Sequence, residues 1–493
     1  MKMRPELAGQ SLVVVDGDEL PAAYRATAAV EELGGRVLHR YGPRVLICEA
    51  PRRVQARIEQ RPEVRAVHVA PVDRTPTRLS PAEELGIEAW NLRTSAPYAD
   101  AKAERPREGE RWDVAGGLPD IPDGPGMVHL GGPEEARIFG AEDMSPYLIG
   151  SVAVGLVIVE GPTAALRFSA EERTKVVAEV QEGLGWLAGR EARANITWAY
   201  DIRNVRLDVA PDVSLSGYEP LEAHWRNPAL ASLGFAASFG GVTDYVRSIR
   251  TAQGTRWGYA AFFTKYPTNH FAYAGKPRLV MQYANDGWGP DNIDRVFTHE
   301  TGHIFGCPDE YSASGCRCDA KAGFLREPNA NCQSCAPSFV ECLMAANTWA
   351  MCPHTLVHFG WRDTDADGTF DPVDPTSTPS PIDLRSLCSI APWLCQLLGL
   401  GSGTAAAGIV GVRAAEGVVE AEPAVPLRVL RGVLDDEAMA RVQEAVRNEE
   451  MRYVEAVERK LRAAIDQLER VRAESVSIES EPKPARRRGK RRT

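Results

Sequence analysis

Apolar and polar positions along the first 72 residues predict a small unit of strands and amphipathic helices. Short apolar runs such as LVVV and VLIC are typical of buried strands, whereas AAYRATAAVEELGG spaces its apolar residues at helical intervals and ends with glycine. The predicted order is strand, helix, two strands, helix and strand. The segments are 11–17, 22–35, 36–51 as a hairpin, 52–63 and 64–71.

This β-α-β-β-α-β order predicts a ferredoxin-like module, which we assign to residues 1–75. Residues 76–127 are rich in Pro, Arg, Glu and Asp and show little periodicity, so we expect an extended linker or strap there. A generic small α/β module is the alternative interpretation of the first segment, because its sequence carries no catalytic motif.

A third segment, residues 128–375, has the pattern of a larger α/β domain. SVAVGLVIVEG is a continuous apolar run, which predicts a strand buried on both faces. Ser169 and Glu172 form a capping box for a long amphipathic helix. A later helix is expected to be capped by Asn292 or Asp291. Further strands are predicted at 194–209, 257–266 and 278–286.

Beyond residue 375 we predict a helical C-terminal extension. Residues 376–426 read as short helices and a linker, in which Cys388 and Cys395 are close enough to bridge. The basic tail, residues 476–493, is predicted to be disordered, and its segment 482–493 is a candidate for binding anions. Residues 427–475 read as a charged amphipathic helix for self- or partner association, with a coiled-coil seam of Val454, Val457, Leu461, Ala464, Leu468 and Val471.

Composition narrows the class of protein. A chain of 493 residues, 44% hydrophobic and 25% charged, fits an ordinary soluble protein with two or three domains. Its net charge of −10 argues against a body built to bind nucleic acid. No apolar run is long enough for a membrane span, and the N-terminus has no recognisable signal peptide.

Candidate chemistry concentrates in the stretch HETGHIFGCPDEY. H-E-x-x-H on a helix places His299 and His303 on one face, where two imidazoles can bind a zinc ion. Glu300 lies beside them and can act as a general base towards water. Gly306 can adopt a positive φ and turn the chain sharply, so that Asp309 returns to the metal as a third ligand.

The pattern H-E-x-x-H-x-x-G-x-x-D resembles the motif of the metzincin clan of zinc peptidases, in the variant whose third ligand is aspartate. The extension D-E-Y is similar to that of the immune inhibitor A type, and snapalysin carries a similar aspartate. The resemblance extends over residues 150–362 and implies an α+β catalytic domain with a mixed twisted sheet and an active-site helix. It also implies a methionine turn beneath the zinc, with Met344 as the first candidate and Met351 as the second.

This resemblance implies a zinc-dependent metalloendopeptidase that hydrolyses a polypeptide bound in extended form by backbone β-addition. Zinc held by the three ligands would polarise the scissile carbonyl and lower the pKa of its water. Glu300 would take the proton of that water and pass it to the leaving amine. Tyr311 is the candidate for stabilising the oxyanion.

Two alternatives remain open at this level. The chain could be a non-catalytic zinc-containing binding or scaffold protein built on a peptidase fold, although a purely structural site has no use for Glu300. A downstream glutamate such as Glu341 could replace Asp309 as third ligand. Residues 10–72 resemble the propeptide domains of subtilisin-type proteases. Because a compact module and a strap precede the catalytic domain, residues 1–127 are predicted to restrain the enzyme. The strap would block it sterically, or Cys48 would cap the zinc as in latent matrix-type metzincins.

Seven of the ten cysteines lie between Cys307 and Cys352, which indicates disulfides in an oxidising compartment or metal in a reducing one. The peptidase class and the cysteines suggest an extracellular protein, with a cytoplasmic one as the alternative. Cys342 and Cys352 bracket Met344 and favour a bridge, while Cys307 is expected to be structural. Disulfides or a second, structural zinc are the two interpretations of the C-x-C and C-x-x-C pairs, Cys316, Cys318, Cys332 and Cys335.

An acidic segment, DTDADGTFDPVD, has the spacing of a calcium loop. Its glycine, Gly368, falls at the sixth position, where such loops turn sharply. A solvated acidic turn is the alternative interpretation. The candidate calcium ligands at positions 1, 3, 5, 9 and 12 are Asp363, Asp365, Asp367, Asp371 and Asp374.

Overall fold

The computed structural model describes residues 7, 9–73, 79–113, 144–335 and 339–374 of the chain. The predicted elements of 376–426, 427–475 and 476–493 lie outside these residues. Residues up to Asp374 form one compact unit. Within the described part of the chain, no helix is both long and apolar enough to cross a membrane.

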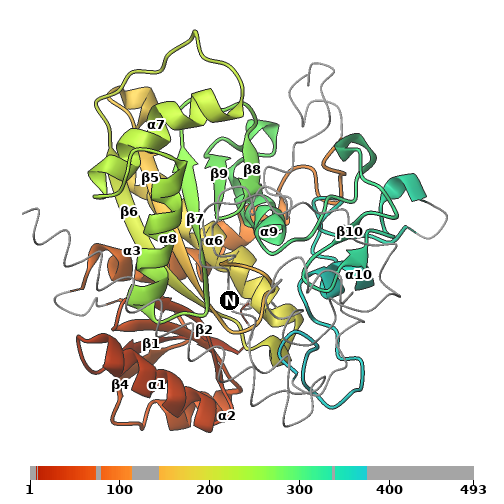
Figure 1. The fold of residues 1–493 in the computed structure, drawn as a ribbon. Coiled ribbons are helices and arrows are strands. Elements are labelled where there is room, and N and C mark those ends of the chain that lie inside the picture. The colour runs from red at the N-terminus through yellow and green to blue at the C-terminus, as the bar shows by residue number, and fades with distance from the viewer. Residues whose placement is uncertain (1–6, 8, 74–78, 114–143, 336–338, 375–493) are drawn as a thin grey trace, which may run out of the picture. The chain divides into compact units, whose positions relative to one another are not determined.

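A single nine-stranded mixed sheet, in the order β4-β1-β3-β2-β6-β5-β7-β9-β8, is the framework of this unit (Figure 1). Together with its helices it makes an α+β fold, as predicted. The strands are β1 (Gln10–Val15), β2 (Arg36–Tyr41), β3 (Val45–Glu49), β4 (Val64–His68), β5 (Ser151–Glu160), β6 (Thr197–Arg206), β7 (Trp257–Thr264), β8 (Ala272–Gly275) and β9 (Arg278–Gln282), with a separate hairpin of β10 (Lys321–Ala322) and β11 (Glu327–Pro328).

The N-terminal segment has the predicted order of elements, with α1 (Leu20–Glu32) after β1 and α2 (Arg52–Ile58) after β3. Its four strands pair antiparallel with one another. However, β2 also pairs in parallel with β6, His39 opposite Trp198 and Tyr41 opposite Tyr200. The segment therefore continues the sheet of the larger domain, which the separate module of the sequence interpretation did not anticipate. Apolar patterns predict strands but not which sheet edges meet.

In the larger domain, β5 lies between β6 and β7 and is parallel to both, so that it is buried on both faces as predicted. Its even-numbered apolar residues, such as Val154 and Leu156, pack with α6 (Ala170–Arg190) on one face. Its odd-numbered residues, such as Val157, pack with α7 (Tyr218–Ser232) and α8 (Phe239–Gln253), which the sequence analysis did not assign. The predicted capping box of Ser169 and Glu172 begins α6.

The region predicted as an extended strap contains two helices, α3 (Pro81–Arg93) and α4 (Ala96–Ala103). Ser80 caps α3 through a capping box with Glu83, and Ser95 caps α4, with proline in the first turn of both. The prolines and acidic residues that indicated a linker are therefore helix N-terminal signals. The linker interpretation is wrong for residues 81–103.

Helix α9 (Ile293–Ile304) carries the H-E-x-x-H sequence and packs against α6. Asn292 precedes it but makes no side-chain cap, because its Oδ1 accepts from the Asn347 amide instead. Its own amide group donates to the carbonyls of Pro106 and Trp288. In the first turn of α9, the backbone N–H of Asp294 donates a hydrogen bond to the Glu179 carboxylate of α6. A carboxylate supplied by another helix thus replaces the cap expected from the sequence. Further along the chain, a short helix, α10, spans Pro353–His358.

Gly183 permits this close contact between α6 and α9, and its replacement tests it. A Cβ atom there would overlap the carbonyl oxygen of Asp294 and the hydroxyl of Thr298. We expect Gly183→Ala to lower the free energy of unfolding by about 1–3 kcal/mol, as overpacking does. Gly189→Ala is the matched control, because a Cβ at Gly189 meets nothing and should stabilise α6 by up to about 1 kcal/mol. Denaturant unfolding of both variants measures the difference, and equal stabilities would contradict it.

Candidate metal centre

Helix α9 and the turn after it bring three metal-binding side chains together. The Nε2 atoms of His299 and His303 are 3.1 Å apart. Gly306 has φ +88°, the conformation predicted for it, and turns the chain back toward α9. The turn places Oδ1 of Asp309 3.2 Å from both Nε2 atoms. The predicted zinc ligands therefore converge on one point.

Both imidazole rings are oriented by backbone carbonyls. Nδ1 of His299 donates to the oxygen of Leu343 at 3.1 Å, and Nδ1 of His303 donates to that of Cys307 at 2.8 Å. Because each Nδ1 keeps its hydrogen on a carbonyl, the nitrogen that loses its proton to a metal is Nε2, and both Nε2 atoms point into the site. The tautomer that a metal requires is thus selected by hydrogen bonds outside the site.

The geometry and charge of this group fit a zinc ion. Ligand atoms about 2.0 Å from a tetrahedral zinc lie about 3.3 Å from one another, close to the observed separations. Both carboxylate oxygens of Asp309 are buried and accept no hydrogen bond from the described residues. Burial alone would lower the pKa of His303, but the Asp309 carboxylate outweighs it and raises that pKa to about 9. The site therefore favours positive charge between its ligands.

Met344 packs against Gly302 of α9, in the turn between the candidate ligands His299 and His303. Its side chain is buried, and its sulfur approaches Gly302 so closely that a Cβ there would lie only 2.8 Å away. The carbonyl of Met344 accepts a hydrogen bond from the N–H of Glu310 at 3.0 Å. This is the place that the resemblance implies for a methionine turn, whereas Met351 is only partly buried.

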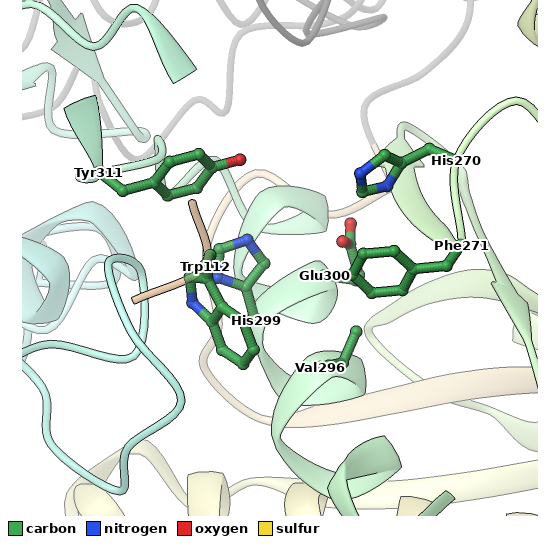
Figure 2. Close-up of a pocket in the computed structure, with 7 residues that line it drawn as sticks. All are labelled: Trp112, His270, Phe271, Val296, His299, Glu300 and Tyr311. Atoms are coloured by element: carbon green, nitrogen blue, oxygen red, sulfur yellow. The ribbon is translucent and has the colours of Figure 1, made fainter. Parts of the chain in front are cut away.

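A small pocket opens beside the three ligands (Figure 2). Glu300 projects into it from α9, is buried, and has one carboxylate oxygen without a hydrogen-bond partner among the described residues. Burial raises the pKa of Glu300, although the two histidines partly offset this. The full lining is Trp112, His270, Phe271, Val296, His299, Glu300 and Tyr311.

Tyr311 faces the pocket from the side opposite His270 (Figure 2). Burial raises the pKa of the Tyr311 hydroxyl well above its ordinary value, and the Asp309 and Glu300 carboxylates raise it further. The hydroxyl therefore stays protonated at neutral pH and can donate a hydrogen bond into the pocket. The sequence analysis placed Tyr311 near the metal only because it follows the zinc motif closely along the chain.

The sequence analysis missed four of the seven pocket residues: the apolar Phe271 and Val296, and the hydrogen-bonding Trp112 and His270. Trp112 comes from the segment after α4, packs edge-on against His299, and donates to the same Leu343 carbonyl at 2.6 Å. His270 precedes β8, where its Nδ1 donates to the oxygen of Ala272 at 2.7 Å. Its Nε2 has no hydrogen-bond partner among the described residues. A lone tryptophan and a lone histidine, each far from the motif in sequence, carry no local signal of this role.

The C-x-C and C-x-x-C cysteines meet in pairs at disulfide distance, Cys316 with Cys332 and Cys318 with Cys335, and the Cα atoms are 5.8 Å apart in each. Three of their sulfurs also lie close enough together to hold a metal ion. Disulfides and a structural zinc therefore both remain compatible with this arrangement.

The bridge expected between Cys342 and Cys352 is not formed, and both thiols are free and buried. Spacing around a short loop indicated proximity correctly, but each sulfur is engaged by neighbouring hydrogen-bonding groups. Cys307 is also a free, buried thiol. Cys48 is fully buried in β3 among the residues that pack on α1 and α2, and it is not part of the zinc group. Glu341 is exposed and likewise outside that group.

The predicted calcium loop is assembled in part. Carboxylate oxygens of Asp363, Asp365 and Asp367 lie within 4.8 Å of one another. Gly368 has φ +95°, and its N–H donates to Asp363 at 3.1 Å. Asp371 instead accepts hydrogen bonds from Arg362 and Thr364 and lies outside the three-residue group, as does Asp374.

Calcium should stabilise the chain if this loop binds it. Binding to the folded form alone would add about 2.7 kcal/mol at a concentration one hundred times Kd. We expect the melting temperature in zinc-replete buffer to rise with calcium and to fall when calcium is chelated. The double variant Asp365→Asn/Asp367→Asn should lose this response, because it removes two of the candidate ligands. It should disturb the fold little, since these two carboxylates accept hydrogen bonds from local N–H groups. An unchanged melting temperature in the wild-type chain would contradict the assignment.

No family model, curated protein or solved structure matches this chain. The geometry of its own residues therefore carries the functional argument.

Proposed function

We propose that this chain is a zinc-dependent endopeptidase with a metzincin-like catalytic domain. The observation that carries the proposal is the convergence of His299, His303 and Asp309 beside the buried carboxylate of Glu300, one oxygen of which has no hydrogen-bond partner among the described residues. Three ligands leave a tetrahedral zinc one open position, which is the composition of a catalytic site and not of a closed structural one.

The order of the sheet supports the same class. A mixed sheet ending in an edge strand beside the motif helix is the arrangement that the metzincin resemblance implies. Here β8 is the edge strand, antiparallel to β9, and it contacts α9. Among the described residues no strand pairs with its other edge. An extended peptide can therefore add to β8 through backbone hydrogen bonds and reach the pocket at Phe271.

The residues around the pocket support the following mechanism of peptide hydrolysis. When bound, zinc acts as a Lewis acid towards a carbonyl group and makes water more acidic. Glu300 accepts the proton of the attacking water and donates it to the leaving amine, and its raised pKa makes it a stronger base. The Tyr311 hydroxyl is the donor available to the developing oxyanion. Nε2 of His270, whose pKa burial lowers, is an acceptor that can orient water or substrate.

A non-catalytic scaffold is the alternative proposal, and Glu300 argues against it. A buried carboxylate without a counter-ion destabilises a protein, so a purely structural zinc site gains nothing from one. The alternative third ligand, Glu341, is exposed and accepts a hydrogen bond from Thr348, whereas Asp309 is buried against both histidines. The geometry thus favours the catalytic interpretation with Asp309.

The test is proteolysis by the purified full chain. We expect it to cleave a denatured protein, to lose activity with a zinc-selective chelator in calcium-containing buffer, and to recover it on adding zinc. Gel electrophoresis and mass spectrometry of the fragments measure cleavage. A folded, zinc-loaded chain that cleaves none of a panel of denatured proteins would contradict the proposal and favour the scaffold.

A further inference from the structure

A second group of potential metal ligands adjoins the first through the chain neighbours Asp309 and Glu310. It consists of Glu310, Cys342 and Cys352, whose ligand atoms lie within 4.8 Å of one another. All three are buried, with exposed fractions of 0%, 0% and 1%. Glu310 follows the zinc ligand Asp309, while Cys342 and Cys352 bracket the Met344 loop. We call this group the lower cluster.

The lower cluster contains a buried carboxylate without a positive partner among the described residues. Glu310 accepts hydrogen bonds from Asn331 at 2.7 Å, Thr355 at 2.8 Å and Cys352 at 3.0 Å, all of which are neutral donors. Buried carboxylates elsewhere outside the pocket have cationic or histidine partners: Glu83 with Arg44, Glu160 with Arg173, Glu179 with Lys102, Glu182 with Arg93, Glu222 with Arg226 and Arg278, Asp294 with Lys102, and Asp309 with His299 and His303.

Neighbouring titratable groups do not supply the missing charge. Burial lowers the pKa of His358, although Glu310 partly offsets this, so that the ring stays neutral. Burial also raises the pKa of the Cys342 thiol, and the adjacent Cys352 and Glu310 raise it further. A cation bound between the three ligand atoms, which lie within 4.8 Å of one another, would supply that charge.

Backbone amides around the lower cluster are arranged to stabilise thiolates. The N–H of Cys352 donates to the sulfur of Cys342 at 3.4 Å, and the N–H of Thr355 donates to that of Cys352 at 3.3 Å. Such hydrogen bonds from outside the coordination shell orient and stabilise metal ligands. The Thr355 hydroxyl lies 3.3 Å from both sulfurs and completes the surroundings.

We propose that Glu310, Cys342 and Cys352 bind a second zinc ion. Its fourth position is closed by the Thr355 hydroxyl, which lies 3.3 Å from both sulfurs and 2.8 Å from the Glu310 carboxylate, so that this ion has a structural role. Two thiolates and one carboxylate select a soft divalent metal such as zinc over calcium or magnesium. The backbone N–H of Glu310 donates to the carbonyl of Met344, so an ion bound to Glu310 would also hold the Met344 loop in position next to the ligands of the upper site. This proposal does not depend on peptidase activity, and it replaces the Cys342–Cys352 bridge predicted from the sequence.

Metal analysis of the full chain, purified under reducing conditions, tests the proposal. Cys342→Ser/Cys352→Ser should contain one zinc equivalent fewer than the wild-type chain, and so should His303→Ala through loss of the upper ion. Combining all three substitutions should remove two equivalents. Cys48→Ala is the matched control, since it removes a buried thiol outside the lower cluster and should keep the wild-type zinc content.

Two further measurements keep the test decisive if the double variant misfolds. Glu310→Gln preserves shape and should weaken binding of the second ion at least about tenfold, because even groups outside the coordination shell are worth that much. Cobalt-substituted protein should show thiolate-to-metal absorption that persists in His303→Ala and decreases in Cys342→Ser/Cys352→Ser. An unchanged zinc content and cobalt spectrum in folded variants would overturn the proposal. So would a Cys342–Cys352 disulfide found by peptide mapping of the untreated protein.

Discussion

Glu300→Gln should abolish most proteolysis while leaving zinc and fold in place. The carboxylate faces the pocket and not the shared point of the three ligands, so the amide removes the base without removing a ligand. Loss of a positioned general base typically costs about 10²–10⁴-fold in rate. We therefore expect kcat/KM to fall by about that factor, measured on a peptide derived from a mapped cleavage site.

Zinc content separates this result from simple damage to the site. Glu300→Gln should retain the wild-type zinc stoichiometry, whereas His303→Ala should lose the ion of the upper site, since two remaining ligands hold zinc poorly. Tyr311→Phe provides a milder contrast that removes only the hydroxyl. If Glu300→Gln kept full activity, or lost its zinc, the role assigned to Glu300 would be wrong.

The motif region could be predicted in detail because its constraints are local. His299 and His303 are four residues apart on one helix, and Gly306 turns the chain within the next few residues, so spacing alone determines how they meet. The capping box of α6 and the strand β5 are local for the same reason. Such features depend on neighbours in sequence and not on the rest of the fold.

The walls of the pocket could not be predicted because they depend on contacts between distant segments. Trp112 reaches His299 across 187 positions of sequence, counted from their residue numbers, and its packing follows from where α4 docks. The pairing of β2 with β6 is equally non-local. Free thiols at Cys342 and Cys352 depend on Glu310 and Thr355 nearby, which spacing along the chain does not reveal.

The described part of residues 1–127 is more closely integrated with the rest of the fold than a removable pro-segment. Arg93 of α3 forms a buried ion pair with Glu182 of α6, at 2.7 Å. After α4, the chain runs beside the Met344 loop. There Arg111 forms an isolated antiparallel β-bridge with Ala346, and the N–H of Trp112 donates to the carbonyl of Ala345. A chain that begins at residue 128 would lack all of these contacts. We therefore expect such a truncation to fold poorly, instead of being the more active form that the sequence interpretation predicts.

Lys102→Met should be among the most destabilising single substitutions in the described region. The ammonium group pairs with Glu179 of α6 and, at 2.8 Å, with Asp294 of α9, and all three side chains are almost wholly buried. Methionine preserves the length of the side chain but leaves two buried carboxylates without this partner. Breaking a buried ion pair in this way costs about 3–5 kcal/mol. Denaturant unfolding at neutral pH should show a loss of that size.

The pH dependence of this loss distinguishes charge from packing. Burial would raise the pKa of Asp294, but Lys102 and Arg105 outweigh it and hold the pKa below its ordinary value. A depressed carboxyl pKa contributes stability that is complete above its unfolded value, about 4, and is lost as the pH falls below it. The difference between wild type and Lys102→Met should therefore narrow as the pH falls through about 4. Lys321→Met, at an exposed position, should leave stability nearly unchanged. A pH-independent loss in Lys102→Met would assign the effect to packing and contradict the role of the ion pair.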